Sequence, residues 1–93
     1  MFFVYILKSL KDDKLYTGST SDLSRRLREH RGGRCKSTSY RRPLTLVYYE
    51  EFETLVEARV REKILKHPTE GKKKKSLIKS FPQEKLNKFV LQS

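Results

Sequence analysis

The sequence predicts a single small α+β domain. Three segments have the β-branched and aromatic composition of strands, at 2–8, 15–18 and 44–50. The stretches that follow the second and third segments have apolar residues at helical spacing. A chain of 93 residues has room for one hydrophobic core. We therefore expect residues 1–93 to form one domain, with a core at about 2–80 and a C-terminal helix at about 82–91.

The first two strands are expected to form a hairpin. Residues 2–8 are an apolar run whose alternation places Tyr5 on the opposite face from its two neighbours. A polar turn follows, and residues 15–18 return. A hairpin centred near residues 10–11 brings Tyr5 opposite Tyr16. Two phenols then become neighbours on one face of the sheet.

A basic helix is predicted after the hairpin. Ser21 or Asp22 can cap its first turn, and it runs to about Arg31, before two glycines. Arg26 and His30 stand four residues apart on this helix and therefore share a face. A polar, basic loop precedes the third strand.

A second helix is predicted between Thr54, which opens a capping-box pattern, and Pro68, which ends it. Glu62 falls on the apolar stripe of this helix. A carboxylate directed toward a sheet is costly unless it is paired. The structural interpretation is a salt bridge to an arginine such as Arg26, and the alternative is a functional carboxylate.

The charge balance favours a polyanionic partner. The chain has 22 Lys and Arg against 11 Asp and Glu, a formal charge of +11, and phosphates neutralised on binding release counterions. The alternative is a merely soluble basic surface, or RNA-rich surroundings such as the ribosome. The lysine run 72–75 can be both a solvated helix start and a phosphate contact. The residues expected to contact nucleic acid are Arg25, Arg34, Lys36, Tyr40, Arg41, Arg42, Lys72, Lys73, Lys74 and Lys75.

Several classes of site are excluded or disfavoured by composition. One Cys and two His cannot complete a zinc site, and no Gly-rich phosphate loop is present. Cys35, a single thiol, fits a reducing compartment, and an inert side chain is favoured over a nucleophile or metal ligand. No apolar run reaches membrane-spanning length, and a signal-peptide pattern is absent at residues 1–3. We expect a cytoplasmic protein with no membrane partner, and a monomer is favoured.

The remaining candidates occur in an order that resembles a known family. Val4-Tyr5-Ile6 and Tyr16-Thr17-Gly18 are followed by Arg26, ten residues after the second tyrosine, then by His30 and Glu62. This ordered set resembles the GIY-YIG nuclease superfamily, in particular its small stand-alone members of the UPF0213 type. The similarity covers residues 2 to about 80, which is nearly the whole chain.

The resemblance implies a small three-stranded antiparallel sheet flanked by helices, with a site on one side that cleaves a phosphodiester with one metal ion. Glu62 would hold Mg²⁺ or Mn²⁺ as a hard oxygen ligand. Arg26 would bind a nonbridging phosphate oxygen. Tyr5 or Tyr16 would be the general base, since a nearby cation can lower a phenol pKa from its ordinary value near 10. His30 would share that task or bind the phosphate.

Two positions depart from the family pattern. Many members have an Asn a little beyond the glutamate, where this chain has lysines 72–75, and some have Lys where this chain has Ser19. Lys74 or Lys75 could substitute as a phosphate contact. The predicted function is a divalent-metal-dependent endonuclease acting on branched, damaged or single-stranded DNA, in repair or recombination. The alternatives are a nucleic-acid-binding module with little or no activity and, less favoured, a recruitment domain.

Overall fold

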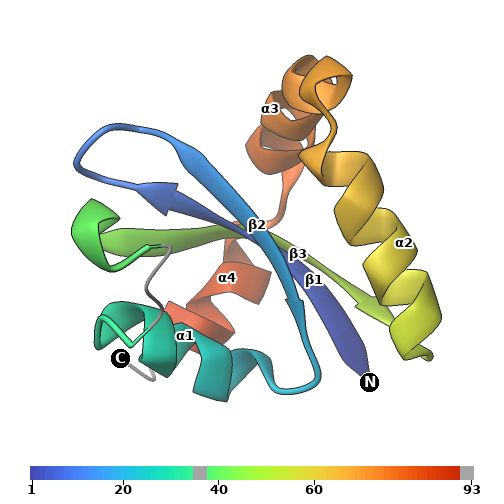
Figure 1. Ribbon diagram of the computed structural model, residues 1–93, viewed down its shortest axis with the longest axis horizontal. Helices are drawn as coiled ribbons and strands as arrows, with labels where there is room; N and C mark the ends of the chain where they lie inside the picture. The colour runs from blue at the N-terminus through green and yellow to red at the C-terminus, as the bar shows by residue number, and fades with distance from the viewer. Residues whose placement is uncertain (35–37, 91–93) are drawn as a thin grey trace.

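The computed structural model describes residues 1–34 and 38–90, and within them a three-stranded antiparallel sheet with helices on both faces (Figure 1). The strands are β1 (Phe2–Ser9), β2 (Leu15–Thr20) and β3 (Leu44–Phe52), in the spatial order β2-β1-β3. The predicted α+β class and the antiparallel sheet are confirmed. The third strand is longer than predicted by two residues at its C-terminal end.

Four α-helices occur in the described part of the chain, with bounds α1 (Leu23–Arg31), α2 (Leu55–Lys66), α3 (Gly71–Ser80) and α4 (Gln83–Val90). Asp22 caps α1 by accepting a bond from the Arg25 amide at 3.1 Å, which selects between the two predicted caps. Thr54 caps α2 as predicted. The sequence did not predict the short 3₁₀ turn Ser39–Arg41 in the basic loop. None of the described helices is long and apolar enough to cross a membrane.

The register of the β1–β2 hairpin differs from the prediction. Tyr5 pairs with Gly18, and Tyr16 pairs with Leu7 rather than with Tyr5. The reason is the turn between the strands, which is closed by a bond from the Ser9 amide to the carbonyl oxygen of residue 14 and contains a left-handed residue, 13, with a φ of 60°. Because the error is two residues, both phenols stay on one face, with ring centroids 6.3 Å apart.

The central strand β1 is buried between two helical layers. On one face, Tyr5 and Leu7 pack with apolar residues of α1 and α4, including Leu27. On the other face, Val4 and Ile6 pack with residues of α2. Figure 1 shows α1 and α4 on one side of the sheet and α2 with α3 on the other. The candidate site residues are therefore divided between the two layers: Arg26 and His30 lie on α1, on the side of Tyr5, and Glu62 lies on α2, on the other side.

Candidate active site

Tyr5 and His30 form the buried centre of the candidate site. Tyr5 has no solvent-exposed surface, and its hydroxyl lies 2.9 Å from Nε2 of His30, which is 1% exposed. Nδ1 of His30 lies 2.8 Å from the Thr38 hydroxyl. Nε of Arg26 donates to the Tyr5 hydroxyl at 3.4 Å. One turn of α1 thus supplies both the cation and the imidazole that contact a single phenol. The four-residue spacing predicted the shared helix face, and the common contact with Tyr5 follows from the packing of α1 on β1.

The imidazole of His30 is neutral at physiological pH. Burial lowers its pKa, the charge of Arg26 lowers it further against the opposing charge of Glu29, and the resulting pKa is about 4. In the tautomer that carries its proton on Nδ1, His30 donates to Thr38 and accepts from the Tyr5 hydroxyl. Tyr5 then has a proton acceptor on one side and a guanidinium on the other. His30 contacts Tyr5 and is buried from solvent.

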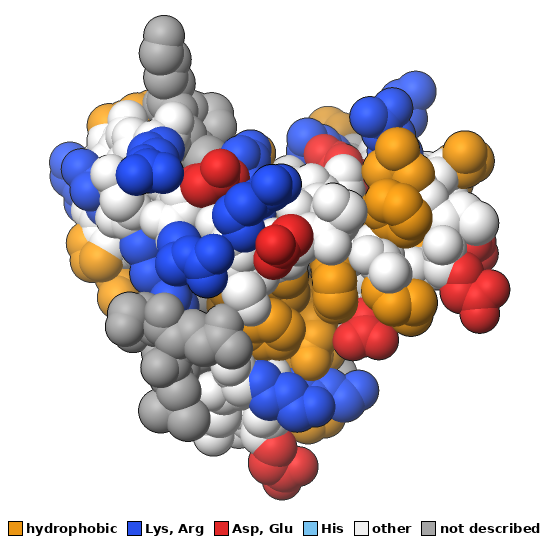
Figure 2. Space-filling view, turned by 90° about the horizontal axis from the view of Figure 1, so that it is seen from below, with side chains coloured by type: hydrophobic (Ala, Val, Ile, Leu, Met, Phe, Trp, Pro, Cys, Tyr) orange, Lys and Arg blue, Asp and Glu red, His pale blue; other side chains and the backbone are white. Residues whose placement is uncertain are grey.

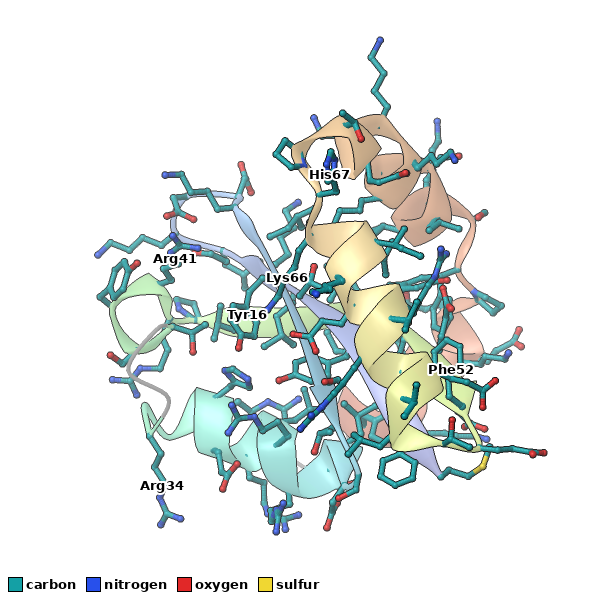
Figure 3. The ribbon with its side chains drawn as sticks, turned by 45° about the vertical axis from the view of Figure 1, so that its right-hand side comes forward. Tyr16, Arg34, Arg41, Phe52, Lys66 and His67 are labelled. Atoms are coloured by element: carbon teal, nitrogen blue, oxygen red, sulfur yellow. The ribbon has the colours of Figure 1, made fainter. Side chains whose placement is uncertain are left out.

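Tyr16 covers this centre from the neighbouring strand. Its ring centroid lies 5.1 Å from that of His30 and 6.3 Å from that of Tyr5, and the residue is partly exposed. Figure 3 shows Tyr16 on β2, in a view where Arg34 and Arg41 lie toward the edge of the molecule. Tyr16 is therefore the more accessible of the two phenols.

Gly18 leaves the space that the Tyr5 phenol occupies. A Cβ atom at position 18 would lie 2.6 Å from the Tyr5 hydroxyl oxygen and 3.1 Å from the ring of Tyr16. A Cβ atom so close to the hydroxyl would force one of the two groups to shift. The hydroxyl of Tyr5 therefore lies directly against a position of β2 that carries no side chain. The glycine of the second tyrosine segment has a steric reason that sequence reasoning did not identify.

Glu62 is held on the inner side of α2 by two contacts that the sequence did not predict. Its side chain is 19% exposed, the Ser19 hydroxyl donates to Oε1 at 2.5 Å, and the Lys66 ammonium lies 2.7 Å from Oε2. Burial raises the pKa of Glu62, but the hydrogen bonds from Lys66 and Ser19 and the charges of Lys66 and Arg59 outweigh it, so the pKa is lowered. The carboxylate is ionised at neutral pH.

The expected salt bridge between Glu62 and Arg26 is replaced by two other pairs. Glu62 pairs with Lys66, and Arg26 pairs with Glu29 at 3.1 Å on its own helix. Both new pairs are local to one helix, at i,i+4 and i,i+3. This spacing was the signal that could have found them. Arg26 keeps about a third of its side chain exposed.

The four lysines of the run 72–75 have different surroundings at the start of α3. Lys74 is partly buried, and burial together with the charge of Lys66 lowers its pKa. Lys73 pairs with Glu70 at 3.8 Å, and the other two are exposed. Lys74 is thus the member of the run whose charge interacts with Lys66, the residue that pairs with Glu62.

The remaining predicted nucleic-acid contacts lie on α1 and in the basic loop. Arg25, Arg34 and Arg42 are exposed, and Lys36 lies outside the described residues. Tyr40 is 62% exposed, and the guanidinium of Arg41 lies 5.3 Å from the centre of its ring. Figure 2, which views the molecule from below Figure 1, shows Lys and Arg side chains gathered on one part of this face. The structure shows where these side chains lie and does not test what they bind.

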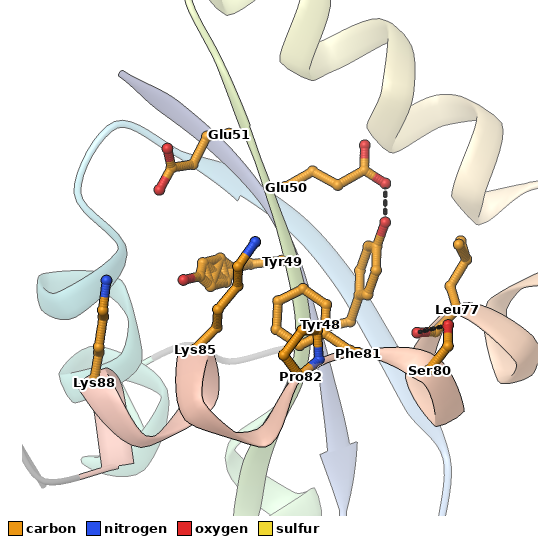
Figure 4. A pocket seen from close by; sticks show the side chains of 10 residues that line it. All are labelled: Tyr48, Tyr49, Glu50, Glu51, Leu77, Ser80, Phe81, Pro82, Lys85 and Lys88. Atoms are coloured by element: carbon orange, nitrogen blue, oxygen red, sulfur yellow. Dashed lines mark hydrogen bonds between the residues drawn. The ribbon is translucent and has the colours of Figure 1, made fainter.

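A hollow of about 630 Å³ lies elsewhere, at the outer edge of β3. It is lined by side chains of β3, α3, α4 and the turn between these two helices, among them Tyr49, Phe81 and Lys85 (Figure 4). Glu50 at this hollow accepts bonds from Tyr48 and Arg61, and burial together with Glu50 raises the pKa of Tyr48 to about 12. None of the five catalytic candidates lines it. This hollow therefore does not mark the candidate active site.

A single divalent cation fits the donor set at Glu62. No cluster of three His, Cys, Asp or Glu occurs among residues 1–34 and 38–90. Mg²⁺ does not need one, because it retains several waters and is held by one or two carboxylates and by substrate phosphates. The half-buried, ionised carboxylate of Glu62 is such a ligand. A cation there has to compete with the Lys66 ammonium.

Comparison with known proteins agrees with the fold. The family model described as the GIY-YIG catalytic domain matches residues 1–76. The chain therefore belongs to the GIY-YIG catalytic domain family, a nuclease superfamily.

Within that family the chain is similar to proteins designated UPF0213. The UPF0213 protein CPE1444 of Clostridium perfringens is 42% identical over 92 residues, covering 97% of this chain and 98% of that protein. The UPF0213 protein lwe0147 of Listeria welshimeri is 42% identical over 77 residues, covering 82% and 84%. The solution NMR structure of the UPF0213 protein BH0048 from Bacillus halodurans matches with a TM-score of 0.53 at 38% identity, covering 85% and 84% of the two chains.

Proposed function

We propose that this protein is an endonuclease that hydrolyses phosphodiester bonds in DNA with one divalent metal ion, Mg²⁺ or Mn²⁺. The observation that carries the proposal is the position of the Tyr5 hydroxyl between a guanidinium, Arg26, and a neutral imidazole, His30. Membership of a nuclease superfamily supports the reaction class. The basic charge of +11 supports a nucleic-acid substrate.

Each residue has a role that follows from its contacts. Glu62 would hold the metal, which when bound supplies Lewis-acid polarisation of the phosphate. Arg26, with an exposed part of its side chain, would bind a nonbridging oxygen and oppose the charge that develops in the transition state. Lys74 would contact an adjacent phosphate.

Tyr5 is the proposed general base. Its hydroxyl can pass a proton to Nε2 of His30, and the Arg26 guanidinium stabilises the phenolate that results. His30 is neutral and Thr38 orients its other nitrogen, so Nε2 presents a lone pair to the hydroxyl. Because the pKa of His30 is about 4, it is a weak acceptor, and the transfer depends on the stabilisation of the phenolate by Arg26. Tyr16 borders the same centre and, being partly exposed, is proposed to contact the substrate.

The substrate contacts favour backbone over base recognition. The proposed DNA-binding side chains are mostly Lys and Arg, which bind phosphate without reading sequence. We propose branched, damaged or single-stranded DNA as the substrate, with repair or recombination as the setting.

A second candidate function is a nucleic-acid-binding module with little activity. The observation that favours it is that both oxygens of Glu62 are already engaged, by Ser19 and Lys66.

A nicking assay distinguishes the two functions. Purified protein is incubated with duplex, branched and single-stranded DNA, with and without Mg²⁺ or Mn²⁺, and Glu62→Gln is compared with Glu53→Gln, an exposed carboxylate of the same charge. The endonuclease proposal expects metal-dependent nicking that Glu62→Gln loses and Glu53→Gln keeps. Equal inactivity of the wild type and Glu62→Gln, with both binding DNA, would support the binding module.

A further inference from the structure

The carboxylate of Glu62 already carries a cation that belongs to the protein. The Lys66 ammonium lies 2.7 Å from Oε2, one turn further along α2, while the Ser19 hydroxyl fixes the other oxygen. Because the Glu62 side chain is only 19% exposed, this contact differs from the solvated i,i+4 pairs common on helix surfaces. Lys66 thus occupies the position at Glu62 that the proposed function assigns to a divalent metal ion.

Lys66 has the freedom to leave this position. Half of its side chain, 51%, is exposed, and it is the last residue of α2. Its flexible four-carbon stem can move the ammonium without moving the helix. Figure 3 shows Lys66 at the end of α2, where the chain turns toward α3.

A second ammonium, that of Lys74, lies near Lys66. Lys74, at the start of α3, is partly buried and close enough for the charge of Lys66 to lower its pKa. Lys66 contacts the carboxylate of Glu62, and Lys74 adds a second positive charge near Lys66. If a metal ion occupied Glu62, the two ammoniums would need an anion, and a phosphate oxygen is the anion that a nucleic acid brings.

We propose that Lys66 is a displaceable internal cation: a divalent metal binds Glu62 by displacing the Lys66 ammonium, which then binds a substrate phosphate together with Lys74. This inference rests on the proposed function, and it adds that metal and DNA bind cooperatively. Displacement by either ligand prepares the site for the other, and the coupling is reciprocal. In the absence of DNA the protein therefore binds metal weakly.

Mn²⁺ binding to the protein in the absence of DNA tests the displacement. The binding is measured by electron paramagnetic resonance, from the signal of unbound Mn²⁺. Lys66→Met should tighten Mn²⁺ binding about tenfold, the size of effect expected for removing one unit charge near a carboxylate. Lys66→Arg should resemble wild type. Lys63→Met, which removes an equal charge from an exposed site on the same helix, should change the affinity less than about twofold. Glu62→Gln should abolish specific binding.

The coupling is tested by fluorescence anisotropy of a phosphorothioate duplex that resists cleavage. Mn²⁺ should raise the DNA affinity of wild type and of Lys63→Met about fivefold, and that of Lys66→Met less than twofold. If Lys66→Met binds Mn²⁺ no more tightly than wild type does, the inference is overturned. Glu62→Gln binding Mn²⁺ like wild type would instead overturn the metal assignment within the proposed function.

Discussion

The hydroxyl of Tyr5 lies 2.9 Å from Nε2 of His30, although 25 residues separate them in the chain. The contact joins the central strand to α1 across the interior of the protein. Arg26, on the same helix, reaches the same oxygen. A buried phenol thereby gains both a hydrogen-bond acceptor and a neighbouring positive charge, the two contacts on which the proposed role of Tyr5 rests.

Replacing Tyr5 should damage catalysis more than replacing Tyr16. Tyr5→Phe removes the proposed base and should lower the single-turnover nicking rate about 10²–10⁴-fold with little change in DNA affinity. Tyr16→Phe keeps the ring that packs on His30 and should cost about tenfold or less. Rate measurements at saturating protein separate chemistry from binding. A larger loss in Tyr16→Phe would move the base to Tyr16.

The neutral state of His30 should make folding stability pH-dependent. Its pKa falls from 6.5 in the unfolded chain to about 4 in the folded protein, because of burial and then Arg26. Between these values the unfolded state binds more protons, so stability rises with pH and is lost on acidification from about 6.5 to 4. The free energy of unfolding should therefore be about 3 kcal/mol higher above pH 6.5 than below pH 4, as far as His30 is concerned.

Urea unfolding of wild type and variants from pH 4 to 7 measures this effect. His30→Asn should flatten the pH dependence of the free energy of unfolding over that interval. His67→Asn, which changes an exposed histidine, should leave it as in wild type. If the two variants have the same slope, His30 is not the group responsible.

Gly18→Ala should displace the Tyr5 side chain in the candidate active site. The new methyl group would lie 2.6 Å from the Tyr5 hydroxyl, so the phenol must move away from Arg26 and His30. We expect a loss of about 1–3 kcal/mol in stability and a strong loss of nicking. Gly71→Ala is the matched control, because a Cβ there meets no atom within 4 Å and a helix prefers alanine. Equal stability of both variants would contradict the close approach.

DNA binding should depend steeply on salt. If several phosphates are contacted, the logarithm of the association constant falls linearly with the logarithm of salt concentration. Lys74→Gln should reduce the slope by about one, whereas Lys88→Gln, an exposed lysine of α4 at the β3 hollow, should leave it unchanged. Anisotropy titrations at several salt concentrations measure both slopes. A flat response in wild type would contradict phosphate as the main contact.

The parts of the fold that depend on local patterns could be predicted from sequence. The caps at Asp22 and Thr54 and the helical spacing of Arg26 and His30 depend on neighbouring residues. The hairpin register could not be obtained this way, since a turn centred one residue further along shifts each cross-strand partner by two residues and leaves the same alternation intact.

Only part of the candidate site could be predicted from sequence, because some of its contacts join residues that are far apart in the chain. Tyr5 and His30 were expected near each other, but nothing local indicated that His30 would be buried and bonded to Thr38. The bond between Ser19 and Glu62 joins residues 43 positions apart, and its existence depends on how α2 packs over β2. Such partners follow from tertiary packing rather than from a spacing in the sequence.

The most direct test of the account is the Mn²⁺-dependent nicking rate of Glu62→Gln beside wild type and Glu53→Gln, with DNA affinity measured in parallel. The account predicts that Glu62→Gln nicks DNA at least about 10²-fold more slowly at saturating protein while it still binds DNA, and that Glu53→Gln matches wild type. Equal metal-dependent nicking by Glu62→Gln and wild type would contradict the assignment of Glu62 as the metal ligand.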